Sequence, residues 1–274
     1  MASPQKIKQA VLGLTILVLV GGSSVAYQKI QQKRLSLSHK SQQEQIVLKG
    51  KNLQGAELTA VDEQGNPLKF QIRNVELDPQ DPEQEIHLYT IFYQDKQDSE
   101  WKNLCTPDRD NVAKAIPFKG TWDKKGNYIE SDIVTFGCTS GNIGKCARFG
   151  YKPWKVVNGR PLRDFHQACM RMLSADYCGD GIAHTRQGTP INIYDVLEIE
   201  KPEPAPNMVF EAAWGPDGAT FVNRLRWTES PTKIFQECPE KLRGKINTHP
   251  EEITMEEVLQ KSPDSLIFND SIIR

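Results

Sequence analysis

Residues 161–175 read PLRDFHQACMRMLSA, and they form the one internal stretch of the chain whose apolar residues have helical spacing. Pro161 suits the first turn of a helix, and the glycines at positions 179 and 181 suit its termination. The apolar side chains that would share one face of this helix are Leu162, Phe165, Cys169, Met172 and Leu173. The spacing therefore predicts one central helix over residues 161–175.

Around this helix the chain has the alternating pattern and the turn residues of short β-strands. Residues 57–77 alternate on both sides of a turn at residues 65–67, which predicts a hairpin, and a slip of phase at Arg73 and Asn74 predicts a β-bulge. Further strands or hairpin arms are expected at residues 87–93, 133–136, 147–151, 191–199, 208–214 and 219–227. The expected turns between them are at residues 123–127, 139–144 and 215–218. We predict a mainly β domain of the α+β class.

The N-terminal residues have the pattern of an export segment. Lys6 and Lys8, with no acidic residue beside them, precede an apolar run over residues 10–20, and residues 24–26 supply the small side chains that a signal peptidase reads. The run is also just long enough, when it is extended to residue 27, to anchor the chain in a membrane. The expected parts are a signal peptide or transmembrane anchor at residues 1–27 and a polar linker at residues 28–50.

The remaining chain has the composition of a folded domain. Hydrophobic residues make up 38% of the 274 residues and charged residues 25%, which is enough apolar material for a core. The net charge is −1 and acidic and basic residues are interspersed, so nothing favours a nucleic-acid partner, which would need a basic face. We expect a β-rich domain at residues 51–246 and a C-terminal tail at residues 247–274, in which Thr254 and Glu257 form the capping box of a short helix.

The cysteine count is even, which favours disulfide bonds in an exported protein. The six disulfide candidates are Cys105, Cys138, Cys146, Cys169, Cys178 and Cys238. Six cysteines allow 15 pairings, and the sequence does not select one of them. Proximity along the chain suggests Cys138 with Cys146 across a hairpin, and Cys169 with Cys178 between the helix and the loop after it.

The densest cluster of polar side chains follows the central helix. The residues of this possible functional cluster are His166, Asp176, Tyr177, Asp180, His184 and Arg186. Two kinds of chemistry are open to the same region. Two histidines and two cysteines are the ligand set of a tetrahedral zinc site, here His166, Cys169, Cys178 and His184.

The second kind of chemistry is a cysteine nucleophile. The segment 169–171, Cys-Met-Arg, resembles the Cys-x-Arg segment of L,D-transpeptidases, which are β-rich envelope enzymes that act through a thiolate. Ala168 stands where that family has glycine, and no His-Gly segment precedes it. A cysteine on the apolar face of a helix is more often structural. We therefore assign no catalytic residue, no metal site and no cofactor from the sequence.

Residues 174–181 read SADYCGDG and resemble the segment for which the ADYC domain is named, a family of uncharacterised bacterial proteins that usually carry export signals. The other segments that carry the resemblance are residues 136–138, 145–146, 150–154, 166–169 and 212–219. The resemblance covers roughly residues 105–226 and implies a family, but no activity.

The leading expectation is an exported or membrane-anchored envelope protein with a binding or structural role. The protein would be secreted, or would face the periplasm or cell exterior with the membrane as its partner through the N-terminal segment. The alternative is an envelope enzyme that uses the region from His166 to His184. We favour a structural corner for this region, in which Asp176 and Tyr177 anchor the loop by hydrogen bonds and glycines permit its tight turns.

Overall fold

The computed structural model describes residues 50–61, 67–94, 99–227, 234, 236–247 and 253–272. The expected signal peptide or anchor and nearly all of the expected linker lie outside these residues, so they stay predictions. Within the described part of the chain, no helix is both long enough and apolar enough to cross a membrane.

An antiparallel sheet forms the N-terminal part of the fold, in the strand order β1-β2-β3-β5-β6, with β4 paired to β3. A short 3-10 helix, η2 (Gly50–Leu53), precedes it. The strands are β1 (Glu57–Val61), β2 (Pro67–Leu77), β3 (His87–Gln94), β4 (Trp101–Asn103), β5 (Ala115–Trp122) and β6 (Tyr128–Cys138). β2 carries the predicted bulge, because its register with β3 shifts between Ile72 and Asn74.

A second antiparallel sheet forms the C-terminal part, in the order β11-β10-β12-β9. Its strands are β9 (Ile191–Asp195), β10 (Met208–Gly215), β11 (Gly218–Val222) and β12 (Ile267–Ile272). Two short helices accompany this sheet, α5 (Pro239–Leu242) and α6 (Met255–Lys261). The predicted capping box is present at the start of α6, where Thr254 and Glu257 bond to each other's backbone.

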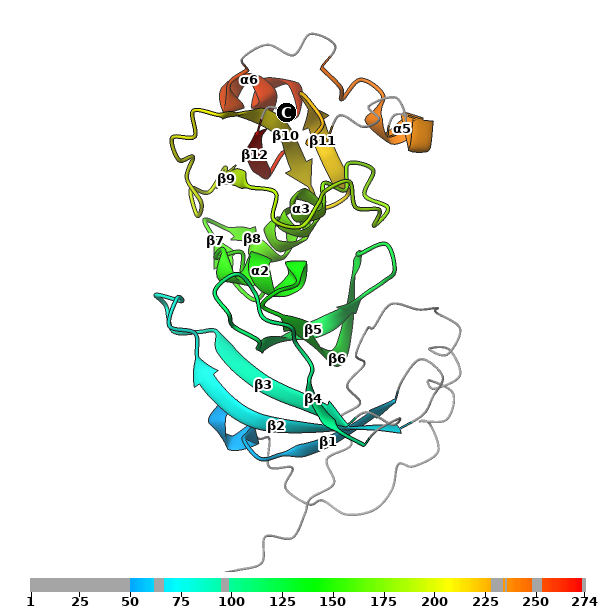
Figure 1. Ribbon diagram of the computed structural model, residues 1–274. Helices are drawn as coiled ribbons and strands as arrows, with labels where there is room; N and C mark the ends of the chain where they lie inside the picture. The colour runs from blue at the N-terminus through cyan, green and yellow to red at the C-terminus, as the bar shows by residue number, and fades with distance from the viewer. Residues whose placement is uncertain are drawn as a thin grey trace, which may run out of the picture.

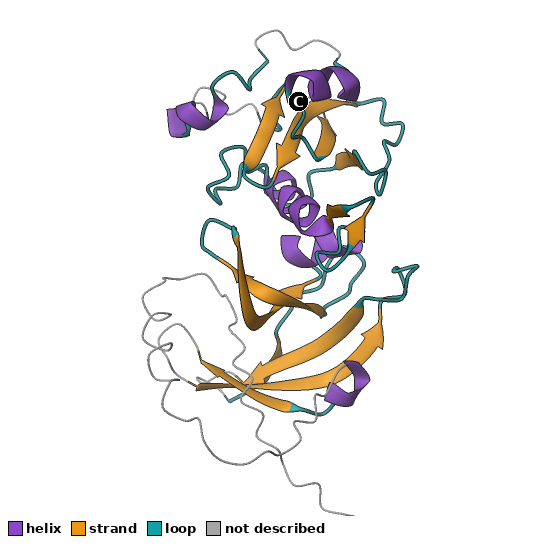
Figure 2. Cartoon of the chain, turned by 180° about the vertical axis from the view of Figure 1, so that it is seen from behind, coloured by secondary structure: helices purple, strands orange, loops and turns teal. Residues whose placement is uncertain are grey.

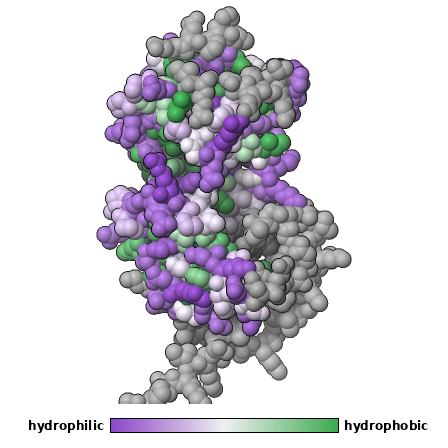
Figure 3. Space-filling view, in the orientation of Figure 1, coloured by the Kyte–Doolittle hydropathy of each residue, from purple (hydrophilic) through white to green (hydrophobic). Residues whose placement is uncertain are grey.

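Helices α2 (Asn142–Arg148) and α3 (Leu162–Ser174) lie between the two sheets (Figures 1 and 2), next to a small hairpin of β7 (Val156–Val157) and β8 (Arg160–Pro161). The predicted helix face is buried, since Leu162, Phe165 and Met172 are almost inaccessible to solvent. They belong to a core cluster that also includes Trp214 of β10 and Ile267 of β12. The central helix is therefore the layer onto which the second sheet packs. In Figure 3 the described surface on the viewed face is mostly hydrophilic, with smaller hydrophobic areas between polar ones.

The fold is mainly β with few helices, as predicted, but four local predictions were wrong. One of them is the strand expected at residues 219–227, which ends at Val222. The expected hairpin of residues 133–136 and 147–151 is strand β6 followed by the short helix α2, whose N-cap residue, Gly141, provides no side-chain cap. The strand expected at residues 191–199 ends at Asp195, because the Asp195 carboxylate accepts hydrogen bonds from the backbone N–H groups of Leu197 and Glu200 and turns the chain.

The last difference concerns the C-terminus. The expected tail contains the predicted short helix, but it also contributes β12, which pairs with both β10 and β9 inside the second sheet. Polar side chains of β12 are buried there, since Asn269 and Ser271 are almost inaccessible to solvent. The predicted boundary at residue 247 is therefore not a boundary between a domain and a tail, because the second sheet needs β12.

Candidate functional site at the helix exit loop

All six cysteines lie in the described part of the chain, and all are in disulfide bonds. The pairs are Cys105–Cys138, Cys146–Cys169 and Cys178–Cys238. Both pairings suggested by proximity along the chain were wrong. Cys146 lies on α2, which packs against α3, and so it meets Cys169 across a helix interface.

These bonds remove the thiolates on which both enzyme alternatives depend, because neither a nucleophile nor a zinc ligand is available from a disulfide sulfur. Among the described residues, no group of three or more His, Cys, Asp and Glu side chains is arranged to hold a metal ion. The cysteines therefore act as cross-links: Cys105–Cys138 joins the segment after β4 to the end of β6, Cys146–Cys169 joins α2 to α3, and Cys178–Cys238 joins the loop after α3 to the residue before α5.

The two histidines of the predicted cluster belong to different surroundings. His166 is buried, and its Nε2 lies 2.9 Å from the carbonyl oxygen of Ile143. Burial lowers the pKa of His166 to about 4, which keeps the ring neutral near pH 7. His184 is partly exposed beyond the helix, and its Nε2 lies 3.5 Å from Glu237 Oε2.

Arg171 connects four segments that the sequence separates. Its Nη1 lies 2.6 Å from Asp176 Oδ2, and its Nε donates to the carbonyl oxygen of Pro216 at 3.1 Å. The same guanidinium donates to the backbone of Lys125 and to the side chain of Asn127, in the β5–β6 turn. One buried cation therefore joins α3, the signature loop (residues 175–181), the β5–β6 turn and the β10–β11 turn.

Asp176 holds the signature loop closed, as predicted. Its carboxylate accepts hydrogen bonds from the backbone N–H groups of Gly181 at 2.9 Å and Asp180 at 3.1 Å, in addition to Arg171. The loop then packs directly on the β10–β11 turn. A Cβ at Gly179 would lie 1.9 Å from the carbonyl oxygen of Asp217, and the φ of Gly179 is 67°, so only glycine fits.

Tyr177 points the other way, into the core. Its hydroxyl donates to Glu211 Oε1 at 3.0 Å and accepts the backbone N–H of Arg226 at 2.9 Å. Glu211 in turn pairs with Arg226, whose Nε lies 2.9 Å from Glu211 Oε2, and accepts the Asn269 amide at 3.0 Å. Burial and the carboxylate of Glu211 raise the pKa of Tyr177 well above its usual value. The ring is thus a neutral structural anchor, stacked on Trp214.

On its solvent side the signature loop borders a groove of about 680 Å³, which we call the outer groove. The groove lies between the signature loop, the two turns that Arg171 joins, and α5. Its lining residues are Lys125, Asn127, Cys178, Gly179, Asp180, Asp217, Glu237, Cys238, Pro239, Glu240 and Lys241. Most of its charged side chains are exposed, and the Cys178–Cys238 bond contributes to its wall.

Of the predicted cluster, only Asp180 lines the outer groove. Arg186 lies instead over the ring of Trp227, with its guanidinium carbon 4.0 Å from the ring centre. The sequence did not reveal Asp217 or Glu240 as neighbours of Asp180. Asp217 lies in the predicted turn at residues 215–218, and Glu240 follows Pro239 at the start of α5. Contacts of Arg171 and the Cys178–Cys238 bond place these two segments next to the signature loop.

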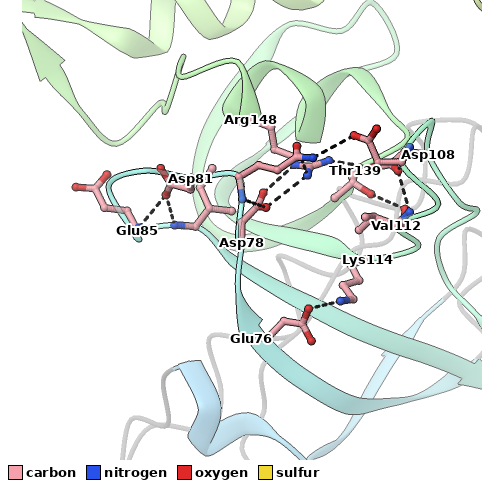
Figure 4. Close-up of polar contacts among 12 residues, drawn as sticks. Glu76, Asp78, Asp81, Glu85, Asp108, Val112, Lys114, Thr139 and Arg148 are labelled. Atoms are coloured by element: carbon pink, nitrogen blue, oxygen red, sulfur yellow. Dashed lines mark hydrogen bonds and ion pairs between the residues drawn. The ribbon is translucent and has the colours of Figure 1, made fainter.

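A second polar cluster connects the first sheet to α2 and the chain after it (Figure 4). Arg148 Nε lies 2.7 Å from Asp78 Oδ2, and its Nη1 lies 3.0 Å from Asp108 Oδ2. Lys152 is buried, and its Nζ lies 2.7 Å from Asp81 Oδ1. Burial alone would raise the pKa of Asp81, but the hydrogen bonds from Lys152 and from three backbone N–H groups outweigh it and lower the pKa to about 2. This cluster fastens the β2–β3 loop and is internally paired.

The comparison with known families gives one result. A family model described as the ADYC domain matches residues 50–228. The match includes every strand of the first sheet, both helices between the sheets, and β9, β10 and β11, but it ends before α5, α6 and β12. No curated protein and no solved structure matches the chain.

Proposed function

Since the chain belongs to the ADYC domain family, we propose that its ADYC domain is a binding module of an exported or membrane-anchored envelope protein. The outer groove is the contact surface, and the partner is a basic segment of a polypeptide. The protein faces the periplasm or the cell exterior.

The disulfides support the proposed compartment. Bonds of this kind persist in oxidising compartments and are rare in the cytosol, where thiols are kept reduced. The pattern of Lys6 and Lys8 before an apolar run supports the same location, because it is the pattern of an export segment.

One observation carries the choice of a binding role. Four side chains of α3 and the signature loop that have catalytic potential are bonded inside the domain: Cys169 and Cys178 in disulfides, Asp176 with Arg171, and Tyr177 with Glu211. The exposed charges lie outside, around the outer groove. This arrangement suits a rigid corner that presents a surface, and it gives no support to a thiolate or zinc enzyme.

The charge of the outer groove favours one class of partner. Four carboxylates line the outer groove (Asp180, Asp217, Glu237 and Glu240), against two ammonium groups (Lys125 and Lys241). The groove volume lies in the range of sites that hold a small molecule or a few side chains of a peptide. A surplus of negative charge in a concave surface favours a basic ligand, and the attraction weakens as salt screens it.

The test is peptide binding to the full-length chain in detergent, measured by fluorescence anisotropy. A lysine-rich labelled peptide is compared with a glutamate-rich one at about 0.05 M and about 0.5 M salt. The variant Asp217→Asn/Glu240→Gln removes two exposed charges from the groove. Asp132→Asn is the matched control, because Asp132 is fully exposed on β6 and does not line the groove.

We expect the lysine-rich peptide to bind, and the groove variant to weaken binding about fivefold or more at low salt, which corresponds to about 1 kcal/mol. The control should bind like the unmodified protein. Equal affinity of the groove variant and the control, or equal affinity for the two peptides, would overturn the proposed surface.

A further inference from the structure

A row of four aromatic rings runs from Trp154 through Phe118 and Trp122 to Tyr128. Its ring centres are 6.1 Å apart from Trp154 to Phe118, 5.9 Å from Phe118 to Trp122 and 5.3 Å from Trp122 to Tyr128. Trp154 is 46% exposed at one end and Tyr128 is partly exposed at the other. Phe118 and Trp122 are buried between them and form the floor of the row.

Polar atoms without partners accompany this row. Trp122 Nε1, Gln167 Oε1 and Arg163 Nη1 are buried, and within the part of the chain that the structure describes none has a hydrogen-bond partner. The whole side chains of Trp122 and Gln167 are more than nine-tenths buried. An unpaired buried donor or acceptor costs about 1–3 kcal/mol, so each of these atoms gains from a group that bonds to it.

The row also carries one positive charge, that of Arg163. The guanidinium carbon of Arg163 lies 4.0 Å from the ring centre of Tyr128, and no ion pair of Arg163 exists among the described residues. His166, packed against Phe118 and Trp122, stays neutral near pH 7 because burial lowers its pKa to about 4. A cation over an aromatic face, without a carboxylate, is suited to a ligand that supplies one.

We propose that this aromatic row is a binding site for an acidic oligosaccharide, with one sugar ring on Trp154 and a sugar carboxylate on the guanidinium of Arg163. Aromatic rings offer rigid apolar faces to the C–H groups of a sugar, and hydroxyl groups both donate and accept hydrogen bonds. The Tyr128 ring packs on Trp122 and lies under the Arg163 guanidinium, and both Tyr128 and Arg163 are partly exposed, so we infer that these two side chains shield Trp122 Nε1 and Gln167 Oε1 from solvent. A ligand that draws the Arg163 side chain outward gives these two atoms hydroxyl partners.

The site is independent of the proposed peptide surface, because no residue of the row lines the outer groove. The two proposals therefore fail separately. The probe is an oligomer of uronic acid units, titrated into the full-length chain in detergent and measured by calorimetry, with a neutral glucose oligomer of the same length beside it. Four variants are needed: Trp154→Ala, Arg163→Gln, Arg163→Lys and, as a control, Val156→Ala. Val156 is 64% exposed on the neighbouring β7 and carries no ring.

We expect the uronic acid oligomer to bind with a Kd of about 1 mM or tighter, and the neutral oligomer to bind at least about tenfold more weakly. Trp154→Ala and Arg163→Gln should each weaken binding of the acidic oligomer about tenfold, and Arg163→Lys should restore part of it, because it keeps the charge but loses the planar fork. Val156→Ala and the groove variant Asp217→Asn/Glu240→Gln should bind normally.

Three results would overturn the proposal. The first is equal affinity for the acidic and the neutral oligomer. The second is unchanged affinity in both Trp154→Ala and Arg163→Gln, with both variants folded by their far-ultraviolet spectra. The third is failure to bind the acidic oligomer together with Trp154-dependent binding of vesicles that contain phosphatidylglycerol, which would make this face a membrane contact instead.

Discussion

Replacement of Arg226 by methionine should be among the most damaging single changes in the domain. The Arg226 and Glu211 side chains are 1% and 0% exposed, so the change leaves a carboxylate in the core without its cation. Arg226 also donates to the carbonyl oxygen of Met172 at 2.9 Å and to Thr185 Oγ1 at 3.2 Å. The variant therefore breaks the contact between β10, the end of α3 and the segment after the signature loop.

The magnitude follows from what is left behind. Removal of one partner from a buried ion pair costs about 3–5 kcal/mol, because the other charge stays buried. Glu211 keeps its hydrogen bonds from Tyr177 and Asn269, and the Met172 carbonyl oxygen keeps its bond from the Ala175 N–H, so the loss stays within this range. We expect a total of about 4 kcal/mol, a large part of the 5–15 kcal/mol typical of a domain.

The assay is urea unfolding of the oxidised protein at pH 7, followed by tryptophan fluorescence. Arg243→Met is the matched control, because its ion pair with Glu240 is largely exposed and should contribute less than about 0.5 kcal/mol. The double variant Glu211→Gln/Arg226→Met should be more stable than Arg226→Met alone, since it removes the unpaired charge. A loss below about 1 kcal/mol in Arg226→Met, or a double variant that is less stable than the single one, would refute this reasoning.

Three other predictions concern a tightly packed glycine, a buried ion pair and a disulfide bond. Gly179→Ala should destabilise the domain by more than about 3 kcal/mol in urea unfolding, because its Cβ would lie 1.9 Å from Asp217 O. The control Gly159→Ala, also at positive φ but with open space around it, should cost about 1 kcal/mol. Similar costs for the two variants would contradict the close packing of the signature loop on the β10–β11 turn. Asp81→Asn should be less stable than the unmodified protein at pH 7 by at most about 2 kcal/mol. Because the pKa of Asp81 is lowered to about 2, this difference in stability should be complete above about pH 4 and vanish as the pH falls to about 2. A pH-independent difference in thermal unfolding would exclude the ion pair with Lys152 as its cause. Cys178→Ser/Cys238→Ser should lose about 4 kcal/mol, because the bond closes a loop of 60 residues in the unfolded chain, and a variant with unchanged stability would mean that this bond is absent.

Local signals predicted much of the fold. A few neighbouring residues were enough to predict the apolar face of α3, the β1–β2 hairpin with its bulge, the turn between β10 and β11, and the capping box of α6. Helix α2 was missed because residues 139–144 are rich in glycine, serine and asparagine, and these favour loops. Its helical state is fixed by tertiary contacts, the Cys146–Cys169 bond and the ion pairs of Arg148.

Strand β12 was missed because polar residues interrupt its apolar pattern. Asn269 and Ser271 interrupt an apolar pattern, yet they are buried, and Asn269 bonds Glu211 and the indole of Trp214. A polar residue is buried in a core where hydrogen-bond partners from distant parts of the sequence meet it, so the spacing of apolar residues does not predict its position. The same limit applied to the disulfide pairs and to the outer groove, whose walls come from four separate segments.

Disulfide mapping by mass spectrometry, on the chain purified from the cell envelope without reductant, tests the central claim most directly. That claim is that the cysteines of the ADYC domain are structural cross-links in an exported protein. The predicted result is the three peptide pairs Cys105–Cys138, Cys146–Cys169 and Cys178–Cys238, with no free thiol and no stoichiometric zinc. A free thiol at Cys169 or Cys178 in the folded protein, or zinc bound by the reduced chain, would contradict it.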